Sequence, residues 1–219
     1  MAGLRKSTVL LSGFEPFGGE AINPSWEVAQ ALHGKLVEGA RIQALCLPCV
    51  FGEALQVLAV ALRRHRPQLV LALGQAEGRG DFSVERVAIN VDDARIADNA
   101  GALPIDAPVI AGAPAAYFST LPIKAIVAAL HAAGLPASVS QSAGTFVCNH
   151  VFYGLMHALR RRPGARAGFM HLPLLPEQAA QHVGQPSLPL TTLVHGVELA
   201  LLTAARTRHD LHAQGGSIA

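Results

Sequence analysis

SAGTFVCNH, residues 142–150, links a strand-like run at residues 136–140 to a helix-like run at residues 148–159. The stretch therefore predicts a tight turn that delivers Cys148 to the first turn of a helix. Free backbone N–H groups and the positive end of the helix dipole favour an anion at that position. A cysteine so placed is expected to have a lowered pKa and to react as a thiolate. The alternative is that Cys148 is a small buried apolar residue.

The composition predicts one folded domain over residues 1–219, with about residues 210–219 as a frayed tail. The chain is 51% hydrophobic and 15% charged, which is ample for a core. Its formal net charge of +2 does not favour a nucleic-acid partner. The basic clusters at residues 63–66 and 160–162 each end a helical pattern, where cations interact well with the helix dipole. We therefore interpret them as helix ends and not as phosphate sites.

No run of apolar residues is long enough to span a bilayer, so no membrane association is expected. The apolar run near residues 8–11 is short, lacks a following cleavage site, and is interpreted as a first strand. Three cysteines are an odd number for a disulfide framework, which favours reduced thiols and a cytoplasmic location.

Strand-like and helix-like segments alternate along most of the chain, and the strands are apolar on both faces. This pattern predicts an α/β fold: an α/β/α sandwich whose largely parallel, twisted central sheet is flanked by helices. The predicted strands are residues 8–11, 41–48, 69–73, 83–91, 137–140 and 165–171. The predicted helices are residues 24–32, 51–66, 122–133, 148–159 and 190–209. Residues 92–114 interrupt the alternation as a long irregular segment, which is often functional.

Four loops follow predicted strands, and sites in such sheets gather beyond the carboxyl ends of strands. They are residues 13–19, 74–80, 142–148 and 171–176. His171 ends one of these strands, so it is expected at the same sheet edge as Cys148, where it could serve as base and acid. The alternative is a hydrogen-bonded structural histidine.

Glu85 is the candidate for a third group, which would orient the imidazole. In the alternating run SVERVAINV, residues 83–91, it shares a face with apolar residues, and a carboxylate there must be paired. The alternative is an edge-strand glutamate paired with an arginine.

Phe14, Phe17 and Phe146 lie in or beside glycine-containing loops and could form a flat apolar slot, although ordinary packing is the alternative. The first loop lacks the spacing and the lysine of a phosphate loop. Cys46 and Cys49 have the spacing of a redox motif, which leaves thiol redox chemistry as a competing hypothesis.

Many ordered blocks of the sequence resemble the pyroglutamyl peptidase I (pyrrolidone-carboxylate peptidase) family of cysteine peptidases. The matching blocks are residues 12–19 (SGFEPFGG), 23–26 (NPSW), 74–76 (GQA), 85–90 (ERVAIN), 94–96 (ARI), 98–99 (DN), 112–124, 142–156, 171–173 (HLP) and 176–178 (PEQ).

The resemblance implies a catalytic triad of Cys148, His171 and Glu85, acting on N-terminally pyroglutamylated peptides through a thioacyl intermediate. It implies that Phe17 and Phe146 enclose the substrate ring. The other implied substrate-binding residues are Phe14, Asn23, which would hold the first loop, Gln75, whose backbone would pair with the lactam, Arg95, near the oxyanion region, and Val147.

The resemblance also implies an enzyme without metal or cofactor that forms a homo-oligomer, either a homotetramer or a dimer. Glu77 and Ala97 depart from the family pattern, which usually has glycine and proline there. A carboxylate at residue 77 would disfavour a thiolate unless Arg79 offset it. Two further hypotheses stay open: another Cys-His amidase, and a catalytically weakened relative that binds pyroglutamyl groups.

Overall fold

The computed structural model describes residues 8–216, and its main feature is a seven-stranded sheet in the order β2-β3-β1-β4-β9-β5-β8. The strands are β1 (Thr8–Phe14), β2 (Leu36–Val37), β3 (Ala40–Leu47), β4 (Leu69–Gln75), β5 (Phe82–Glu85), β8 (Ala137–Ser140) and β9 (Arg166–Leu172). β3, β1, β4 and β9 are parallel, whereas β2 and the pair β5–β8 run the opposite way. The sheet is therefore mixed and mostly parallel.

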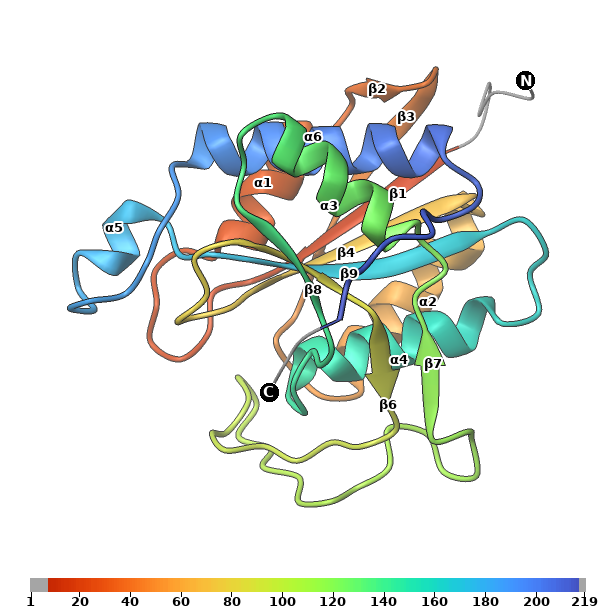
Figure 1. The fold of residues 1–219 in the computed structure, drawn as a ribbon. Coiled ribbons are helices and arrows are strands. Elements are labelled where there is room, and N and C mark those ends of the chain that lie inside the picture. The colour runs from red at the N-terminus through yellow and green to blue at the C-terminus, as the bar shows by residue number, and fades with distance from the viewer. Residues whose placement is uncertain (1–7, 217–219) are drawn as a thin grey trace.

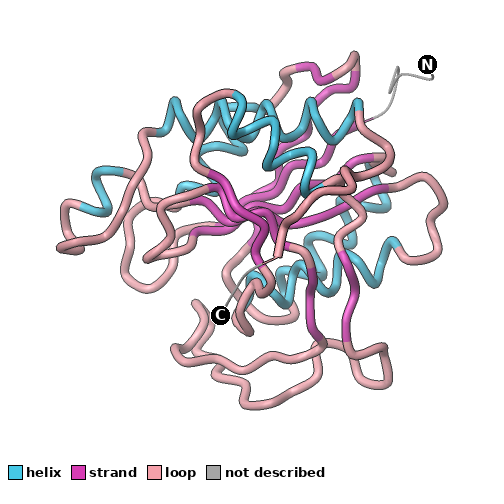
Figure 2. The backbone as a smooth tube through the Cα atoms, viewed as in Figure 1, coloured by secondary structure: helices cyan, strands magenta, loops and turns pink. Residues whose placement is uncertain are grey.

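Helices cover both faces of this sheet, as the α/β prediction required (Figure 1). α1 (Pro24–Leu32), α3 (Ile123–Ala132) and α6 (Leu190–Arg206) lie on one face, and α2 (Glu53–His65) and α4 (Val147–Leu159) lie on the other. A short helix, α5 (Pro176–Ala179), follows β9. Most strands of the main sheet lie between the two helical layers in Figure 2.

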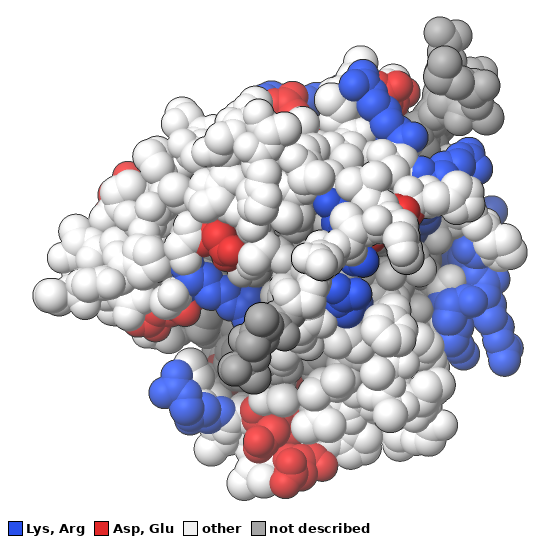
Figure 3. Space-filling model, viewed as in Figure 1, with Lys and Arg blue, Asp and Glu red and all other residues white. Residues whose placement is uncertain are grey.

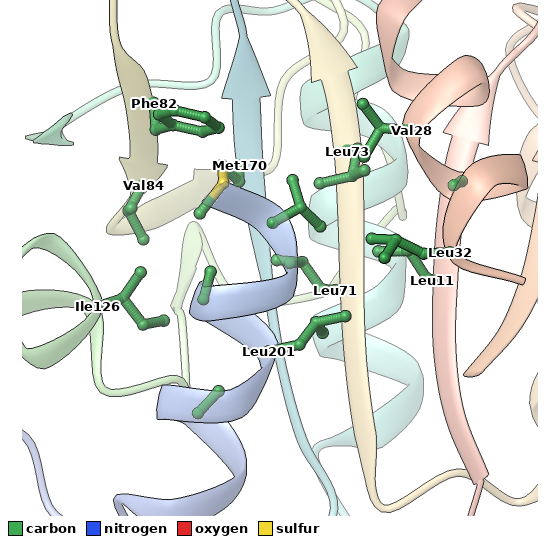
Figure 4. Close-up of a cluster of buried hydrophobic side chains, with 14 of the residues drawn as sticks. Leu11, Val28, Leu32, Leu71, Leu73, Phe82, Val84, Ile126, Met170 and Leu201 are labelled. Atoms are coloured by element: carbon green, nitrogen blue, oxygen red, sulfur yellow. The ribbon is translucent and has the colours of Figure 1, made fainter. Parts of the chain in front are cut away.

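Apolar strands with two buried faces produce two cores, one under each helical layer. In the first core, Leu71 and Leu73 of β4 pack with Met170 of β9 and Leu201 of α6 (Figure 4). The second core lies between the opposite sheet face and the helices α2 and α4, and it includes Phe152 and Phe169. This second core is the one that adjoins Cys148.

The run predicted as one strand over residues 83–91 is broken at Arg86, so that prediction was wrong. The Arg86 N–H donates to Ser140 O in β8, while Arg86 O accepts from Ser119 N. The chain consequently leaves the main sheet, and β6 (Val87–Ile89) forms a separate two-stranded sheet with β7 (Ala116–Phe118). Residues 90–115 form the long irregular segment that joins β6 to β7 (Figure 2).

The expectation that four strand ends meet at one sheet edge also needs correction. β5 pairs antiparallel with β9, and β8 pairs parallel with β5, so β8 ends toward the opposite direction from β4 and β9. Cys148 instead reaches the site because residues 141–146 lead from β8 to α4, which lies against one face of the sheet.

The two basic clusters and Asp210, near the C-terminus, all lie at helix ends. Both basic clusters lie at helix ends as predicted, since α2 ends at His65 and α4 ends at Leu159. Figure 3 shows Lys and Arg side chains gathered on that side of the molecule. Within the expected tail, the Asp210 carboxylate accepts from the N–H groups of Lys124 and Ala125 at the start of α3. Residues 217–219 lie outside the described residues.

Candidate active site

Cys148 is the second residue of α4, because the helix begins one residue earlier than predicted. The N-cap residue Phe146 is extended, with φ −93° and ψ −167°, and no side chain caps the helix. The turn before it uses Gly144 at φ 76°, a left-handed conformation that favours glycine. The first N–H groups of α4 are therefore free of a side-chain cap, and Cys148 lies among them in the first turn.

The Cys148 thiol lies directly over Gly74 of β4. A Cβ atom at Gly74 would come within 2.8 Å of Cys148 Sγ and 2.8 Å of Phe169 Cζ. Gly74 is paired in register with His171 on the neighbouring strand β9, and adjacent strands are separated by about 4.8 Å. The thiol and the imidazole thus belong to one small region of the sheet face. Only a residue without a side chain leaves room for the sulfur there.

The expected lowering of the thiol pKa is not found. Burial raises the pKa of Cys148 above its ordinary value, and Cys49 and Glu85 raise it further, whereas the Arg79 guanidinium opposes the rise. The helix N-terminus alone therefore does not produce a thiolate. A base must accept the proton when the sulfur reacts.

His171 and Glu85 meet in the sheet although 86 residues separate them. The ring Nδ1 of His171 is 2.8 Å from Glu85 Oε1, and both side chains are buried. They share one face because Ser83 of β5 lies opposite His171 in the antiparallel pairing, and Glu85 is two residues further along. The bond at Nδ1 leaves Nε2 as the nitrogen available for proton transfer, and Nε2 has no hydrogen bond within residues 8–216.

Arg79 also binds Glu85, with Nη1 2.8 Å from the same Oε1 atom. The sequence left open whether Glu85 pairs with a histidine or with an arginine. In the structure it pairs with both. Sequence reasoning had assigned Arg79 to Glu77 instead. Glu77 is exposed and is not among the charges that act on the thiol.

Phe17 and Phe146 lie side by side with ring centroids 6.0 Å apart and an interplanar angle of 39°. Phe51, which sequence reasoning missed, supports Phe146 edge-on at 5.4 Å. Phe14 does not join them: it is 2% exposed and packs in the second core against Phe169. Its position in β1, where alternate residues face that core, explains the difference.

The remaining predicted binding residues have varied positions. Asn23 is buried at the N-cap of α1 and donates through Nδ2 to Glu15 O, so it does hold the first loop. Gln75 ends β4, and its Oε1 accepts from Gln178. Val147 is buried in the first turn of α4. Arg95 is exposed in the long irregular segment and has no side-chain hydrogen bond among the described residues.

A second buried histidine–carboxylate pair adjoins the slot. His150 Nδ1 is 2.8 Å from Asp92 Oδ2, and His150 Nε2 accepts from the Gly52 N–H at 2.9 Å. His150 also packs edge-on against Phe51 at 5.3 Å. The sequence signal that could have found this pair is weak, because it depends on a contact across 58 residues.

Asn149 fixes the helix start to the strand β6. Its Nδ2 donates to Ile89 O and Val91 O, each at 2.9 Å, and its Oδ1 accepts from Ile89 N at 3.0 Å. The side chain is fully buried, so these bonds are shielded from water. They hold the residue next to Cys148 in place.

The other two cysteines are the pair with redox-motif spacing. Cys46 and Cys49 are free thiols, and burial raises the pKa of Cys49 to about 12. Burial likewise raises the pKa of Cys46. Within residues 8–216, no group of three or more His, Cys, Asp or Glu side chains is arranged to hold a metal ion. In the same residues, no helix is both long enough and apolar enough to cross a bilayer.

Comparison with known proteins places the chain in a family. The sequence model described as pyroglutamyl peptidase matches residues 7–207. The pyrrolidone-carboxylate peptidase of Cupriavidus taiwanensis is 63% identical, covering 96% of this chain and 99% of that protein. The corresponding protein of Erwinia tasmaniensis is 59% identical over 95% of this chain and 98% of its own length.

Solved structures agree. The crystal structure of pyroglutamyl peptidase I from Bacillus amyloliquefaciens is 45% identical, with a TM-score of 0.92 and coverage of 95% of this chain and 99% of that one. A mutant pyrrolidone carboxyl peptidase from the hyperthermophile Pyrococcus furiosus is 42% identical, with a TM-score of 0.87. The match covers 90% of this chain and 97% of that one. This chain belongs to the pyroglutamyl peptidase family of cysteine peptidases.

Proposed function

We propose that this chain hydrolyses the amide bond after an N-terminal pyroglutamyl residue of peptides, with Cys148, His171 and Glu85 as its catalytic triad. The observation that carries the proposal is the buried 2.8 Å hydrogen bond between Glu85 and His171 Nδ1. That bond fixes the ring so that Nε2 is free, on the sheet face where Cys148 Sγ lies over Gly74.

In the acylation step, Cys148 Sγ attacks the carbonyl carbon of the pyroglutamyl residue while His171 Nε2 accepts the thiol proton. The raised pKa of the buried thiol makes this transfer necessary. Glu85 stabilises the imidazolium that forms. The negative charge on the carbonyl oxygen is stabilised by the backbone N–H of Cys148 at the uncapped start of α4.

Collapse of the tetrahedral intermediate breaks the C–N bond, and the imidazolium returns the proton to the leaving amine. The peptide without its first residue departs, and a thioester joins Cys148 to the pyroglutamyl group. His171 then removes a proton from water, which attacks the thioester. Breakage of the C–S bond releases pyroglutamic acid and restores the thiol.

The neutral, flat lactam offers no charge for recognition, so its selection depends on apolar stacking and a few hydrogen bonds. The rings of Phe17 and Phe146 are 6.0 Å apart, while a ring stacked between them needs about 7 Å because each contact takes about 3.5 Å. Phe17 precedes Gly18 and Gly19, which have positive φ and open space around them, so we expect the first loop to move outward when the lactam binds. The backbone at Gln75 supplies the lactam hydrogen bonds, and Arg95 acts near the oxyanion region.

The test is hydrolysis of pyroglutamyl-aminomethylcoumarin by the wild type and by Cys148→Ala. The wild type should release the fluorophore and the variant should not. Activity that survives in Cys148→Ala would remove Cys148 as the nucleophile. Cys46→Ala is the matched control, because it removes a half-buried thiol that is not among the groups acting on Cys148, and it should retain activity.

A substrate panel separates this proposal from a general Cys-His amidase. The prolyl amide lacks the lactam carbonyl, and the N-methyl pyroglutamyl amide lacks the lactam N–H. Both should be turned over far more slowly than the pyroglutamyl amide. Equal rates on all three would favour a less specific amidase, and tight binding without turnover would favour a weakened binding relative.

We further propose that residues 1–219 act as one peptidase domain, that copies of the chain assemble as a dimer or tetramer, and that the enzyme works in the cytoplasm. Free thiols support a reducing compartment. Exposed apolar side chains at Ile105 and Phe118, 73% and 68% exposed, support self-association. Sedimentation velocity across a concentration series and cell fractionation test these two points.

A further inference from the structure

The Arg79 guanidinium joins three parts of the site. Nη1 donates to Glu85 Oε1 at 2.8 Å and to Ser140 Oγ at 3.2 Å, and Nη2 donates to Ser142 O at 3.1 Å. Ser140 ends β8, and Ser142 lies in the connection that leads to Cys148. One side chain therefore links the carboxylate that orients His171 to the turn that delivers the nucleophile.

Glu85 depends on this contact for its charge balance. Its side chain is 0% exposed, Oε1 accepts from both His171 and Arg79, and Oε2 is buried without a partner among the described residues. A buried carboxylate without a cation is strongly disfavoured. The groups that face it are His171 from β9, Cys148 from α4 and Arg79 from the connection before β5, and only Arg79 carries a permanent positive charge.

Arg79 also separates Glu85 from solvent. A surface hollow of about 550 Å³ lies on its outer side, lined by Arg79, Asp81, Gln141 and the serines 83, 138, 140 and 142. The Arg79 side chain is 33% exposed, whereas Glu85 is fully buried. The guanidinium thus stands between the hollow and the carboxylate, and its removal would open a path from one to the other.

We propose that Arg79 is a positioning residue for catalysis, which holds Glu85 charged and directed at His171 and holds the backbone at Ser142 in the conformation that presents Cys148. The inference rests on the proposed function, because His171 must act as the base. Arg79 does not touch the substrate. Its effect passes through Glu85 and through the turn.

The main test compares Arg79→Ala, Arg79→Lys and Arg206→Ala by kcat, KM and pH profile on the pyroglutamyl amide. Arg206 is the matched control, since it pairs with Glu38 on an exposed surface at 2.8 Å. We expect Arg79→Ala to lower kcat about 100-fold with a smaller change in KM. The acidic limb of the pH profile of kcat should shift upward by about one pH unit in Arg79→Ala. A buried carboxylate without a cation binds a proton more readily, and where it stays charged it favours protonated His171.

Arg79→Lys should keep the acidic limb near that of the wild type and lose only part of kcat, because it retains the charge but not both directions of hydrogen bonding. Arg206→Ala should match the wild type. A wild-type profile in Arg79→Ala would overturn the proposal. So would a loss of activity in both Arg79 variants that is accompanied by a lower Tm and no shift of the limb, which indicates a structural role.

Chemical rescue provides a second test, because the hollow gives small molecules access to the vacated position. Guanidinium at tens of millimolar should raise kcat of Arg79→Ala several-fold, whereas urea, its neutral isostere, should not. Neither compound should activate the wild type or Arg206→Ala. Equal effects of urea and guanidinium would contradict a role for the charge.

Failure of the proposed function can be told apart from failure of this inference. A wild type that does not cleave the amide would contradict the function. The rate of Cys148 alkylation by iodoacetamide against pH still tests Arg79 in that case, since it needs no substrate. A displaced alkylation profile in Arg79→Ala but not in Arg206→Ala supports the proposal, and identical profiles overturn it.

Discussion

Two buried histidine–carboxylate pairs lie near the slot, and they have the same inner geometry. His171 Nδ1 is 2.8 Å from Glu85, and His150 Nδ1 is 2.8 Å from Asp92. The rings differ at the other nitrogen. His150 Nε2 accepts from the Gly52 N–H at 2.9 Å, whereas His171 Nε2 has no hydrogen bond within residues 8–216.

Under the proposed function, a carboxylate beside an imidazole is not enough to make the imidazole a general base. At His150 both nitrogens are engaged, so the ring links two segments of backbone and supports Phe51 against the slot. At His171 one nitrogen stays available for a proton in transit. Both rings have the bond at Nδ1, and the available Nε2 is the feature on which we base the proposed catalytic role of His171.

The largest expected effect comes from replacing each histidine by asparagine. His171→Asn should lower kcat/KM by about 1,000-fold or more, because it removes the general base and acid. His150→Asn should retain kcat within about threefold, since it removes a support and not a proton carrier. Steady-state kinetics on the pyroglutamyl amide measure both. Comparable losses in the two variants would break the comparison.

The carboxylates offer an isosteric pair of changes with the next largest effect. Glu85→Gln should lower kcat about 100-fold, because the amide no longer stabilises the imidazolium. Asp92→Asn should leave kcat nearly unchanged and lower the free energy of unfolding by about 1–2 kcal/mol, through a weakened buried hydrogen bond. Urea denaturation monitored by fluorescence measures the latter. A kinetic effect of Asp92→Asn as large as that of Glu85→Gln would show that both pairs serve catalysis.

Thiol labelling compares the reactivity of Cys148 with that of Cys49 and tests which histidine acts on Cys148. Burial raises the pKa of Cys148 and raises that of Cys49 to about 12, and Cys148 lies over Gly74, the in-register neighbour of His171. Iodoacetamide at pH 7.5 should label Cys148 first, as peptide mass spectrometry would show. The rate should fall about tenfold in His171→Asn and stay unchanged in His150→Asn. Preferential labelling of Cys49 would contradict this assignment.

The same raised pKa values predict a loss of stability in alkali. Above the ordinary thiol pKa of about 8.5, the unfolded chain releases protons that the folded chain retains, so the free energy of unfolding falls as pH rises toward 12. Cys49→Ala should show a smaller decrease in Tm between pH 7.5 and pH 10 than the wild type does. An identical decrease in both proteins would indicate that Cys49 does not contribute.

The smallest effect should appear in substrate affinity. His150→Asn removes the edge-on partner of Phe51, which in turn supports the Phe146 wall, so KM should rise about three- to tenfold with kcat nearly constant. Phe51→Leu should raise KM by a similar factor, because it removes the ring that packs directly against Phe146. An unchanged KM in both variants would show that the His150–Asp92 pair does not support the Phe17–Phe146 slot.

Local patterns predicted most helices and strands, because apolar periodicity and glycine or proline boundaries act over short distances. The helix that carries Cys148 and the strand at Ala137–Ser140 illustrate this success. The break at Arg86 could not be predicted, since it depends on backbone partners at Ser119 and Ser140 that lie far away in sequence. The reversed direction of β5 and β8 has the same origin.

The site was predictable to a similar extent. Chemical type and position identified Cys148, His171 and Glu85 as candidates, and the family resemblance suggested the aromatic slot. Arg79 and the His150–Asp92 pair were not found, because each owes its role to a long-range contact. Phe14 was misplaced, since a loop-like sequence conceals which face of β1 its ring occupies.

The segment at residues 85–91 has a consequence for how the site tolerates heat and sequence change. Glu85 at its start binds the base, while Ile89 and Val91 hold Asn149, the residue next to the nucleophile. A single short length of chain, residues 85–91, therefore sets the separation between the Glu85–His171 pair and Asn149, the neighbour of Cys148. Loosening of the helical layers cannot change that length, whereas inserting or deleting one residue between 86 and 88 would displace Glu85 and His171 relative to Asn149 and Cys148.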